Sequence, residues 1–212
     1  PGERQIESDK RQLNKRINKI KIELKKIEFN KLIQRRNRNK NLNPFISLVG
    51  YTNAGKSTLF NYLTKENVLV KDQLFATLDT TMRKCSLSYN NHIILSDTVG
   101  FIDKLPTTLV AAFRATLEEI EDSNLIIHVL DVSDKELSKK FETSNKILKD
   151  LGYDKKPTII VLNKIDKLKD YHKNINQIDI NQNSNIIGIS ALKKINIEDL
   201  IIKLSYITDQ IR

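Results

Sequence analysis

The 212-residue chain contains one cysteine, four prolines and no tryptophan. The single cysteine, Cys85, excludes a disulfide framework and a metal site built from several cysteines. Its apolar stretches are far shorter than the roughly 20 residues that a membrane-spanning helix needs, and the polar start of the chain has no signal-peptide pattern. Hydrophobic residues nevertheless make up 39% of the chain, enough for a core. We therefore expect a soluble, cytoplasmic protein without a membrane contact.

Basic residues far outnumber acidic residues in the first fifth of the chain. Residues 1–43 hold fourteen basic and five acidic residues, so this segment carries +9 of the formal net charge of +10. The Lys/Asn/Ile-rich composition alone could produce a charged, solvated face. The concentration of the charge in one segment instead favours contact with a polyanion.

The basic segment has the pattern of a helical arm. Residues 7–38 lack glycine and proline, and apolar residues recur at steps of four and three, at Leu13, Ile17, Ile20, Leu24 and Ile27. Such an a/d seam is marginal on a lone helix, so it needs a partner helix, another subunit or a large external surface. The seam is lost before Pro44, which predicts an arm over residues 1–43 and a second domain over residues 44–212.

Short strands alternate with helices after Pro44. Strands are expected at Phe45–Val49, Lys84–Tyr89, His92–Ser96, Leu125–Val132, Thr158–Leu162 and Ile186–Ile189, and helices at Lys56–Thr64, Leu109–Ile120, Leu137–Leu151 and Ile197–Ile211. The turn at Asn90-Asn91 suits a hairpin. The alternation predicts an α/β fold with a mostly parallel sheet covered by helices on both faces.

A phosphate-binding motif lies between the first expected strand and helix. The residues Gly50-Tyr51-Thr52-Asn53-Ala54-Gly55-Lys56-Ser57 match G-x-x-x-x-G-K-S, and Thr58 follows. Glycines let the backbone N–H groups face phosphate oxygens at a helix N-terminus. Lys56 is placed to reach the β- and γ-phosphates, and the Ser57 hydroxyl to ligate Mg²⁺.

Three further motifs follow at expected strand ends. They are Asp97-Thr98-Val99-Gly100, Asn163-Lys164-Ile165-Asp166 and Ser190-Ala191-Leu192. Asp97 would hold Mg²⁺ through water, and the Gly100 N–H would sense a γ-phosphate. A carboxylate at Asp166 accepts two N–H bonds from guanine, which adenine does not offer, and a backbone N–H near Ser190 would meet the guanine O6. The set predicts GTP rather than ATP.

The motifs together closely resemble those of the HflX family of P-loop GTPases. The segments that carry the resemblance are Gly50–Thr58, Phe75-Ala-Thr-Leu-Asp79, Asp97–Phe101, Asn163–Asp166 and the leading segment Pro1–Arg11. The resemblance covers the whole chain. It implies Mg²⁺-dependent GTP hydrolysis and binding to the large (50S) ribosomal subunit, with roles in ribosome splitting, rescue or assembly. Family members normally carry a further N-terminal subdomain and a first long helix, so the arm would be the second half of a helical pair and the chain a fragment.

The resemblance also implies a switch segment made of Phe75, Ala76, Thr77, Leu78 and Asp79. Thr77 would ligate Mg²⁺ beside Ser57 when GTP is bound, with Thr80 or Thr81 as rivals. The catalytic set is then Lys56, Thr77 and Gly100.

Ras-like enzymes place a water-orienting glutamine where this chain has Phe101. Phenylalanine performs no proton chemistry, so we expect slow intrinsic hydrolysis. Some related GTPases use an asparagine at the position of Asn53 to hold K⁺ near the phosphates, although Asn53 could instead only stabilise its loop.

The predicted function is a monomeric, ribosome-associated GTPase that contacts ribosomal RNA through its arm. The alternative is a nucleotide-switched coiled-coil adaptor that binds a protein and hydrolyses GTP incidentally. His128, in an expected strand, fits a core residue better than a ligand.

Overall fold

The computed structural model describes residues 16–17, 43–65, 81–88, 91–101, 118–168 and 185–211. The chain divides into two units, Pro1–Leu42 and Asn43–Arg212, and each is considered by itself. Residues 16 and 17 are helical, but the rest of the expected arm and its seam lies outside the described residues. None of the helices in the described part of the chain has the length and apolar content needed to cross a lipid bilayer.

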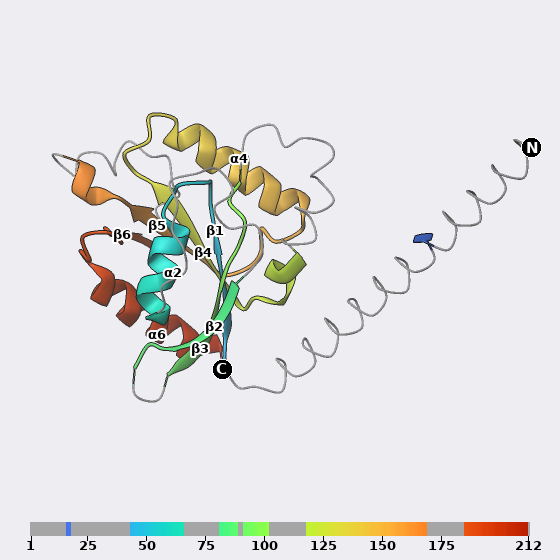
Figure 1. Ribbon diagram of the computed structural model, residues 1–212, viewed down its shortest axis with the longest axis horizontal. Coiled ribbons are helices and arrows are strands. Elements are labelled where there is room, and N and C mark those ends of the chain that lie inside the picture. The colour runs from blue at the N-terminus through green and yellow to red at the C-terminus, as the bar shows by residue number, and fades with distance from the viewer. Residues whose placement is uncertain are drawn as a thin grey trace, which may run out of the picture. The chain divides into compact units, whose positions relative to one another are not determined.

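The second unit is built around a six-stranded sheet in the order β2-β3-β1-β4-β5-β6 (Figure 1). The strands are β1 (Phe45–Val49), β2 (Thr81–Ser86), β3 (His92–Asp97), β4 (Leu125–Asp131), β5 (Thr158–Asn163) and β6 (Asn185–Gly188). The helices are α2 (Lys56–Thr64), η1 (Glu118–Asp122), α4 (Leu137–Asp150), η2 (Ile165–Lys167) and α6 (Ile197–Ile211). Among these six strands, β2 alone is antiparallel to its neighbour. The expected α/β class with a mostly parallel sheet is confirmed.

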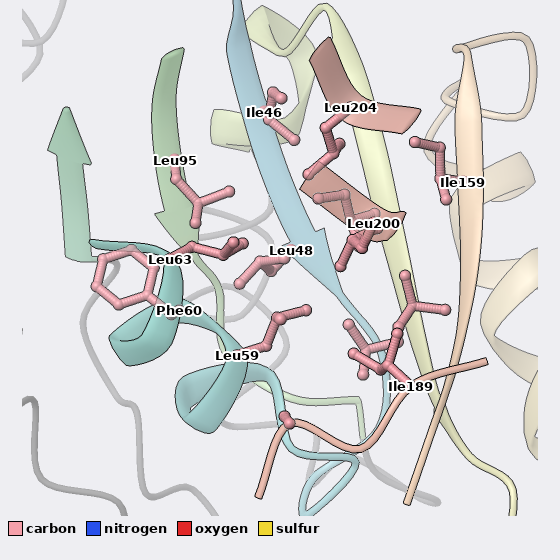
Figure 2. Packing of buried hydrophobic residues seen from close by; sticks show 14 of the residues in the cluster. Ile46, Leu48, Leu59, Phe60, Leu63, Leu95, Ile159, Ile189, Leu200 and Leu204 are labelled. Carbon is pink, nitrogen blue, oxygen red and sulfur yellow. The ribbon is translucent and has the colours of Figure 1, made fainter. Parts of the chain in front are cut away.

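One face of the sheet packs against α2 and α6. Ile46 and Leu48 of β1 point to this side, where they share a core with Leu59 of α2 and Leu200 and Leu204 of α6 (Figure 2). All five side chains are fully buried. Because successive side chains of a strand point to opposite faces, the same strand also supplies Val49 to the other face.

Helix α4 covers the other face. Its side chains at steps of four, three and four residues, Leu137, Phe141, Ser144 and Leu148, form the stripe that faces the sheet. Strands covered on both faces are apolar almost throughout, and all five residues of β1 are buried. The parallel strands therefore direct their carboxyl ends, and the loops that follow, toward one edge.

Two element predictions differ from the structure by more than one residue. Strand β2 begins at Thr81 and ends at Ser86, each three residues earlier than expected, because its pairing with β3 runs from Thr81 opposite Asp97 to Ser86 opposite His92. The end of the expected helix Leu109–Ile120 is a 3₁₀ helix, Glu118–Asp122. Ser123 donates from its backbone and hydroxyl to the Ile120 carbonyl, at 3.1 and 2.7 Å, and the backbone bond has the i to i+3 spacing of a 3₁₀ helix. Residues 109–117 lie outside the described residues.

Candidate functional site

The loop after β1 has the shape of a phosphate cradle because of two glycines. Gly50 has φ of +145°, and a β-carbon there would lie 2.1 Å from the Val129 carbonyl oxygen. Gly55 has φ of +95°, and its β-carbon would lie 2.2 Å from the Asn163 amide nitrogen. Asn53, at φ +61°, is also left-handed, a conformation that asparagine tolerates better than most residues. Helix α2 then begins at Lys56, so its N-terminal N–H groups lie at this loop.

Lys56 folds back over the same loop. Its ammonium donates to the carbonyl oxygens of Gly50, at 3.1 Å, and Tyr51, at 2.9 Å. Burial lowers the pKa of Lys56 to about 8, and the nearby carboxylate of Asp97 opposes part of that shift. A cation held in a buried site with few anionic neighbours is stabilised by any phosphate that enters.

A hydroxyl and a carboxylate meet at the start of α2. The Ser57 hydroxyl donates to Asp97 Oδ2 at 2.6 Å, and Asp97, the last residue of β3, is fully buried. Hard oxygen donors of this kind suit Mg²⁺. No group of three or more His, Cys, Asp or Glu side chains that could hold a metal occurs in the described ranges. The Ser57 hydroxyl and the Asp97 carboxylate fit a Mg²⁺ that takes most of its ligands from phosphate and water, as this ion commonly does.

The segment after Asp97 lies against the phosphate loop. Thr98 donates its hydroxyl to the Leu48 carbonyl at 2.6 Å, and Val99 is buried. Gly100 lies so close to Thr52 and Lys56 that a β-carbon on it would be 2.7 Å from the Thr52 nitrogen.

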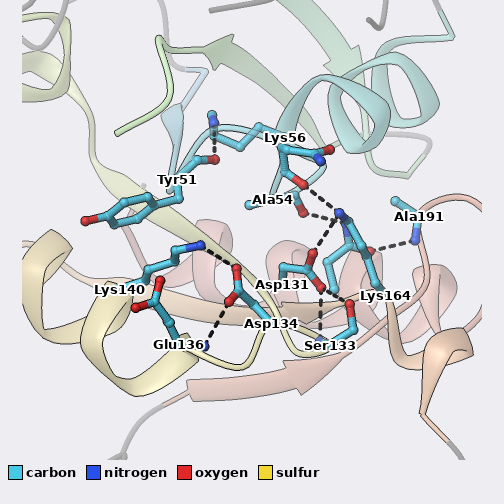
Figure 3. A network of polar contacts seen from close by, with 12 residues as sticks. Tyr51, Ala54, Lys56, Asp131, Ser133, Asp134, Glu136, Lys140, Lys164 and Ala191 are labelled. Carbon is cyan, nitrogen blue, oxygen red and sulfur yellow. Dashed lines mark hydrogen bonds and ion pairs between the residues drawn. The ribbon is translucent and has the colours of Figure 1, made fainter. Parts of the chain in front are cut away.

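Asn163, at the end of β5, joins three loops. Its side-chain amide donates to the Ala54 carbonyl at 2.8 Å, and its side-chain oxygen accepts the Ala191 N–H at 3.0 Å (Figure 3). The first contact reaches the phosphate loop, and the second reaches the loop after β6. The contact brings together two motif segments that lie 109 residues apart in the chain.

Lys164 adds an ion pair that the motif pattern did not predict. Its ammonium donates to the Asn53 carbonyl at 2.6 Å and lies 2.8 Å from Asp131 Oδ2 (Figure 3). Asp131 also accepts the Ser133 N–H at 3.0 Å. The sequence motifs do not include Asp131. Its position at the end of an expected strand was the one signal that could have pointed to it, and in the structure it lies directly opposite Asn163 of β5.

The residues expected around a guanine base lie on neighbouring loops. Asp166 is exposed at the first turn of η2, and the Ile165 N–H donates to the Ile189 carbonyl just before Ser190. The Ser190 hydroxyl accepts the Lys193 N–H at 3.0 Å. Ala191 is buried, and Leu192 is 71% exposed. The exposed carboxylate of Asp166 thus follows a residue that is hydrogen-bonded to the segment just before Ser190.

Some of the residues singled out in the sequence lie outside the described residues, and others lie in the hydrophobic core. The switch residues Phe75–Asp79, with Thr77, lie outside the described residues. His128 is fully buried and pairs with Ser144 at 2.9 Å. Burial lowers its pKa to about 4, and the charge of Lys56 adds to the shift. Cys85 is also buried, which raises its pKa to about 11 and keeps it a thiol.

The class of protein is that of the P-loop GTPases, and the chain has the features of their nucleotide-binding domain. These features are the α/β fold, the phosphate loop with Lys56 and Ser57, the buried Asp97 and the junction at Asn163. Residues 45–164 match the family model described as "50S ribosome-binding GTPase". The chain therefore belongs to the family of 50S ribosome-binding GTPases, and the resemblance to HflX is confirmed by its curated relatives.

Two of these relatives are GTPase HflX of Magnetococcus marinus, 46% identical over 96% of this chain, and GTPase HflX of Escherichia coli, 44% identical over 90% of it. These matches cover 46% and 45% of the two relatives, so the chain spans about half their length. A crystal structure of a GTP-binding protein from Sulfolobus solfataricus in complex with GDP is 34% identical, with a TM-score of 0.68 over 88% of this chain and 59% of the other.

The pKa of Lys56 leads to a pH dependence of nucleotide affinity. Phosphate favours the ammonium form, which predominates below pH 8 in the free protein and is lost above it. We expect GDP affinity, measured by calorimetry at fixed Mg²⁺, to fall about tenfold between pH 7 and pH 9. Lys56→Arg, whose guanidinium stays charged, should bind more weakly but with a flat profile. The same flat profile in the parent chain would contradict the role assigned to the ammonium.

Proposed function

We propose that the chain binds GTP and hydrolyses it to GDP and phosphate while associated with the large ribosomal subunit. The observation that carries the proposal is the junction at Asn163, which brings the phosphate loop, the guanine motif and the loop after β6 to one edge of the sheet. Family membership supports the same reaction.

Guanine selection is assigned to Asp166 and the loop Ser190–Leu192. The Asp166 carboxylate accepts the guanine N1–H and exocyclic amine, while a backbone N–H of the loop donates to O6. Lys164 fixes the approach of the base, because Asp131 and the Asn53 carbonyl hold its ammonium in place. Adenine lacks the two N–H groups that a carboxylate at this position requires.

The reaction is attack of water on the γ-phosphate. Lys56 and the backbone N–H groups of Gly50–Thr58 stabilise the charge on the phosphates, and Gly100 donates its N–H to the γ-phosphate. Ser57, Thr77 and, through water, Asp97 would hold Mg²⁺, which when bound neutralises the oxygens of the β- and γ-phosphates. Phe101 is fully buried and provides no group to orient the water, so intrinsic hydrolysis is slow.

A monovalent cation is the proposed source of the missing charge stabilisation. Asn53 is exposed in the phosphate loop, and its left-handed backbone is held by Lys164. Its amide oxygen is a suitable ligand for K⁺ at the edge of the phosphate site. The ion would supply the positive charge that other GTPases obtain from an arginine.

Association with the ribosome is assigned to the basic arm, residues 1–43, in a cytoplasmic, monomeric protein. The arm holds +9 of the net charge of +10, which suits the phosphate backbone of ribosomal RNA. The family description as 50S ribosome-binding supports this partner. The step that the chain serves is ribosome splitting, ribosome rescue or ribosome assembly.

Replacing the carboxylate of Asp166 should change the base preference. Asp166→Asn should weaken GTP binding by about 1–3 kcal/mol for each unmatched hydrogen bond and improve the relative affinity for xanthosine triphosphate, whose carbonyl accepts the new amide donor. Competition binding against a fluorescent nucleotide measures both. Asp199→Asn, another exposed acid, is the matched control, and equal GTP affinity in the two variants would remove Asp166 from the base site.

Hydrolysis should depend on the monovalent cation through Asn53. We expect the parent chain to release phosphate from GTP faster in KCl than in NaCl at equal ionic strength, and Asn53→Ala to lose this difference. Asn145→Ala, exposed on α4, should keep it. Equal rates of the parent chain in the two salts would show that Asn53 only stabilises its loop.

The arm should dominate the salt dependence of ribosome binding. Reversal of Arg35, Arg36 and Arg38 to Glu should weaken co-sedimentation with 50S subunits. It should also flatten the log–log salt dependence by up to about one unit for each phosphate that the arm no longer neutralises. Reversal of the exposed α4 residues Lys139, Lys146 and Lys149 changes the charge equally and should have little effect. Undiminished sedimentation of the arm variant would favour the coiled-coil adaptor, whose affinity for a helical protein is insensitive to salt.

A further inference from the structure

The segment Asp131–Asp134, at the end of β4, is joined to the phosphate loop through two lysines. Asp131 and Asp134 each pair with an ammonium that comes from another element (Figure 3). Lys164, which follows β5, lies 2.8 Å from Asp131 Oδ2, and Lys140 of α4 pairs with Asp134 Oδ2. Four charged side chains from three parts of the chain therefore meet beside the phosphate loop.

Asp131 directs Lys164 onto the backbone of the phosphate loop. The Asp131 carboxylate is itself fixed, because its Oδ1 accepts the backbone N–H and the hydroxyl of Ser133, at 3.0 and 2.6 Å. Its Oδ2 faces the Lys164 ammonium, which donates to the Asn53 carbonyl at 2.6 Å. The ion pair thus anchors the residue at which the phosphate loop has a left-handed backbone.

Asp134 holds Lys140 over the aromatic ring of Tyr51. The Lys140 ammonium lies 5.7 Å from the centre of that ring, within the range of a cation–π attraction. Tyr51 is buried, and its carbonyl accepts the Lys56 ammonium at 2.9 Å. Partial burial acts to raise the pKa of Asp134, but the hydrogen bond from Lys140 holds it below its ordinary value. The carboxylate is therefore charged at neutral pH and keeps its lysine.

The two ion pairs are better shielded from water than a neighbouring pair on α4. Their four side chains are between 17% and 26% exposed, whereas Glu136 and Lys139 are 55% and 66% exposed. Exposed ion pairs contribute little, while partly buried pairs are screened less. The shielded pairs can therefore orient the phosphate loop. The pair of Glu136 and Lys139, which joins two residues of one helix turn, is a matched control.

We propose that Asp131 and Asp134 are positioning residues for the nucleotide, because each carboxylate holds a lysine that orients one part of the phosphate loop. The inference rests on the proposed binding of guanine nucleotides and adds two residues that lie outside the nucleotide motifs. Asp131 acts through Lys164 at the Asn53 carbonyl, and Asp134 acts through Lys140 at the Tyr51 ring. A phosphate loop held by both pairs loses less conformational freedom when a nucleotide binds, which increases the affinity.

Double-mutant cycles on the full chain test the proposal, with the affinity for GDP measured by calorimetry at fixed Mg²⁺. Asp131→Asn and Asp134→Asn should each weaken binding about fivefold. Asp131→Asn should have at most about a twofold effect in a Lys164→Met chain, since methionine lacks the ammonium through which the carboxylate acts, and Asp134→Asn should behave likewise in a Lys140→Met chain. The crossed combination of Asp131→Asn with Lys140→Met should give additive losses. Glu136→Gln should bind GDP as the parent chain does.

Hydrogen exchange of the nucleotide-free chain separates positioning from a general loss of stability. In both Asp variants the amides of residues 50–58 should exchange at least about threefold faster, while those of α6, on the sheet face opposite α4, should keep the rates of the parent chain. Equal acceleration in α6, or the same loss of GDP affinity with and without the lysine partner, would overturn the inference alone. GDP affinities equal to that of the parent would also overturn it alone. A parent chain that binds no guanine nucleotide would overturn the proposed function together with it.

Discussion

The buried side chain of Asn163 is the contact on which the arrangement of the site depends. It donates to the phosphate loop at Ala54 and accepts from the loop after β6 at Ala191. Gly55 packs so closely on this amide that no other residue fits at that position. Because a buried amide that loses a partner costs about 1–3 kcal/mol, the three loops are fixed relative to one another by one side chain.

Charge at the site is balanced within a small buried volume. Lys56 is buried between loop carbonyls, Asp97 opposes part of the burial effect on its pKa, and the charge of Lys56 in turn lowers the pKa of His128. Neutral His128 bonds Ser144 and so helps to keep α4 on the sheet. The site is thus prepared for an anion, since added negative charge is stabilised by an ammonium that has little other compensation.

Much of the fold follows from local patterns. Phe45–Val49, Lys56–Thr64 and Ile197–Ile211 were predicted with the bounds that the structure has, because short buried runs and 3.6-residue periodicity are local properties. The start of β2 was not, since Thr81, Met82 and the exposed Arg83 are strand residues only through pairing with β3. Asp131 was missed for the same reason: its partner Lys164 is distant in sequence and adjacent only through the strand pairing.

Residue type and spacing were enough to predict which groups carry the nucleotide chemistry, because the glycines, Lys56, Ser57 and the later motifs are local patterns. They were also enough to show that Phe101 stands where a glutamine could orient water. What Phe101 does instead depends on the assembled fold. A parallel bridge between Tyr51 and Phe101, and the burial of that ring in a cluster with Leu148 of α4, require β1, β3 and the helix to be in place. Contacts of this kind depend on distances between segments about fifty residues apart, which no local pattern encodes.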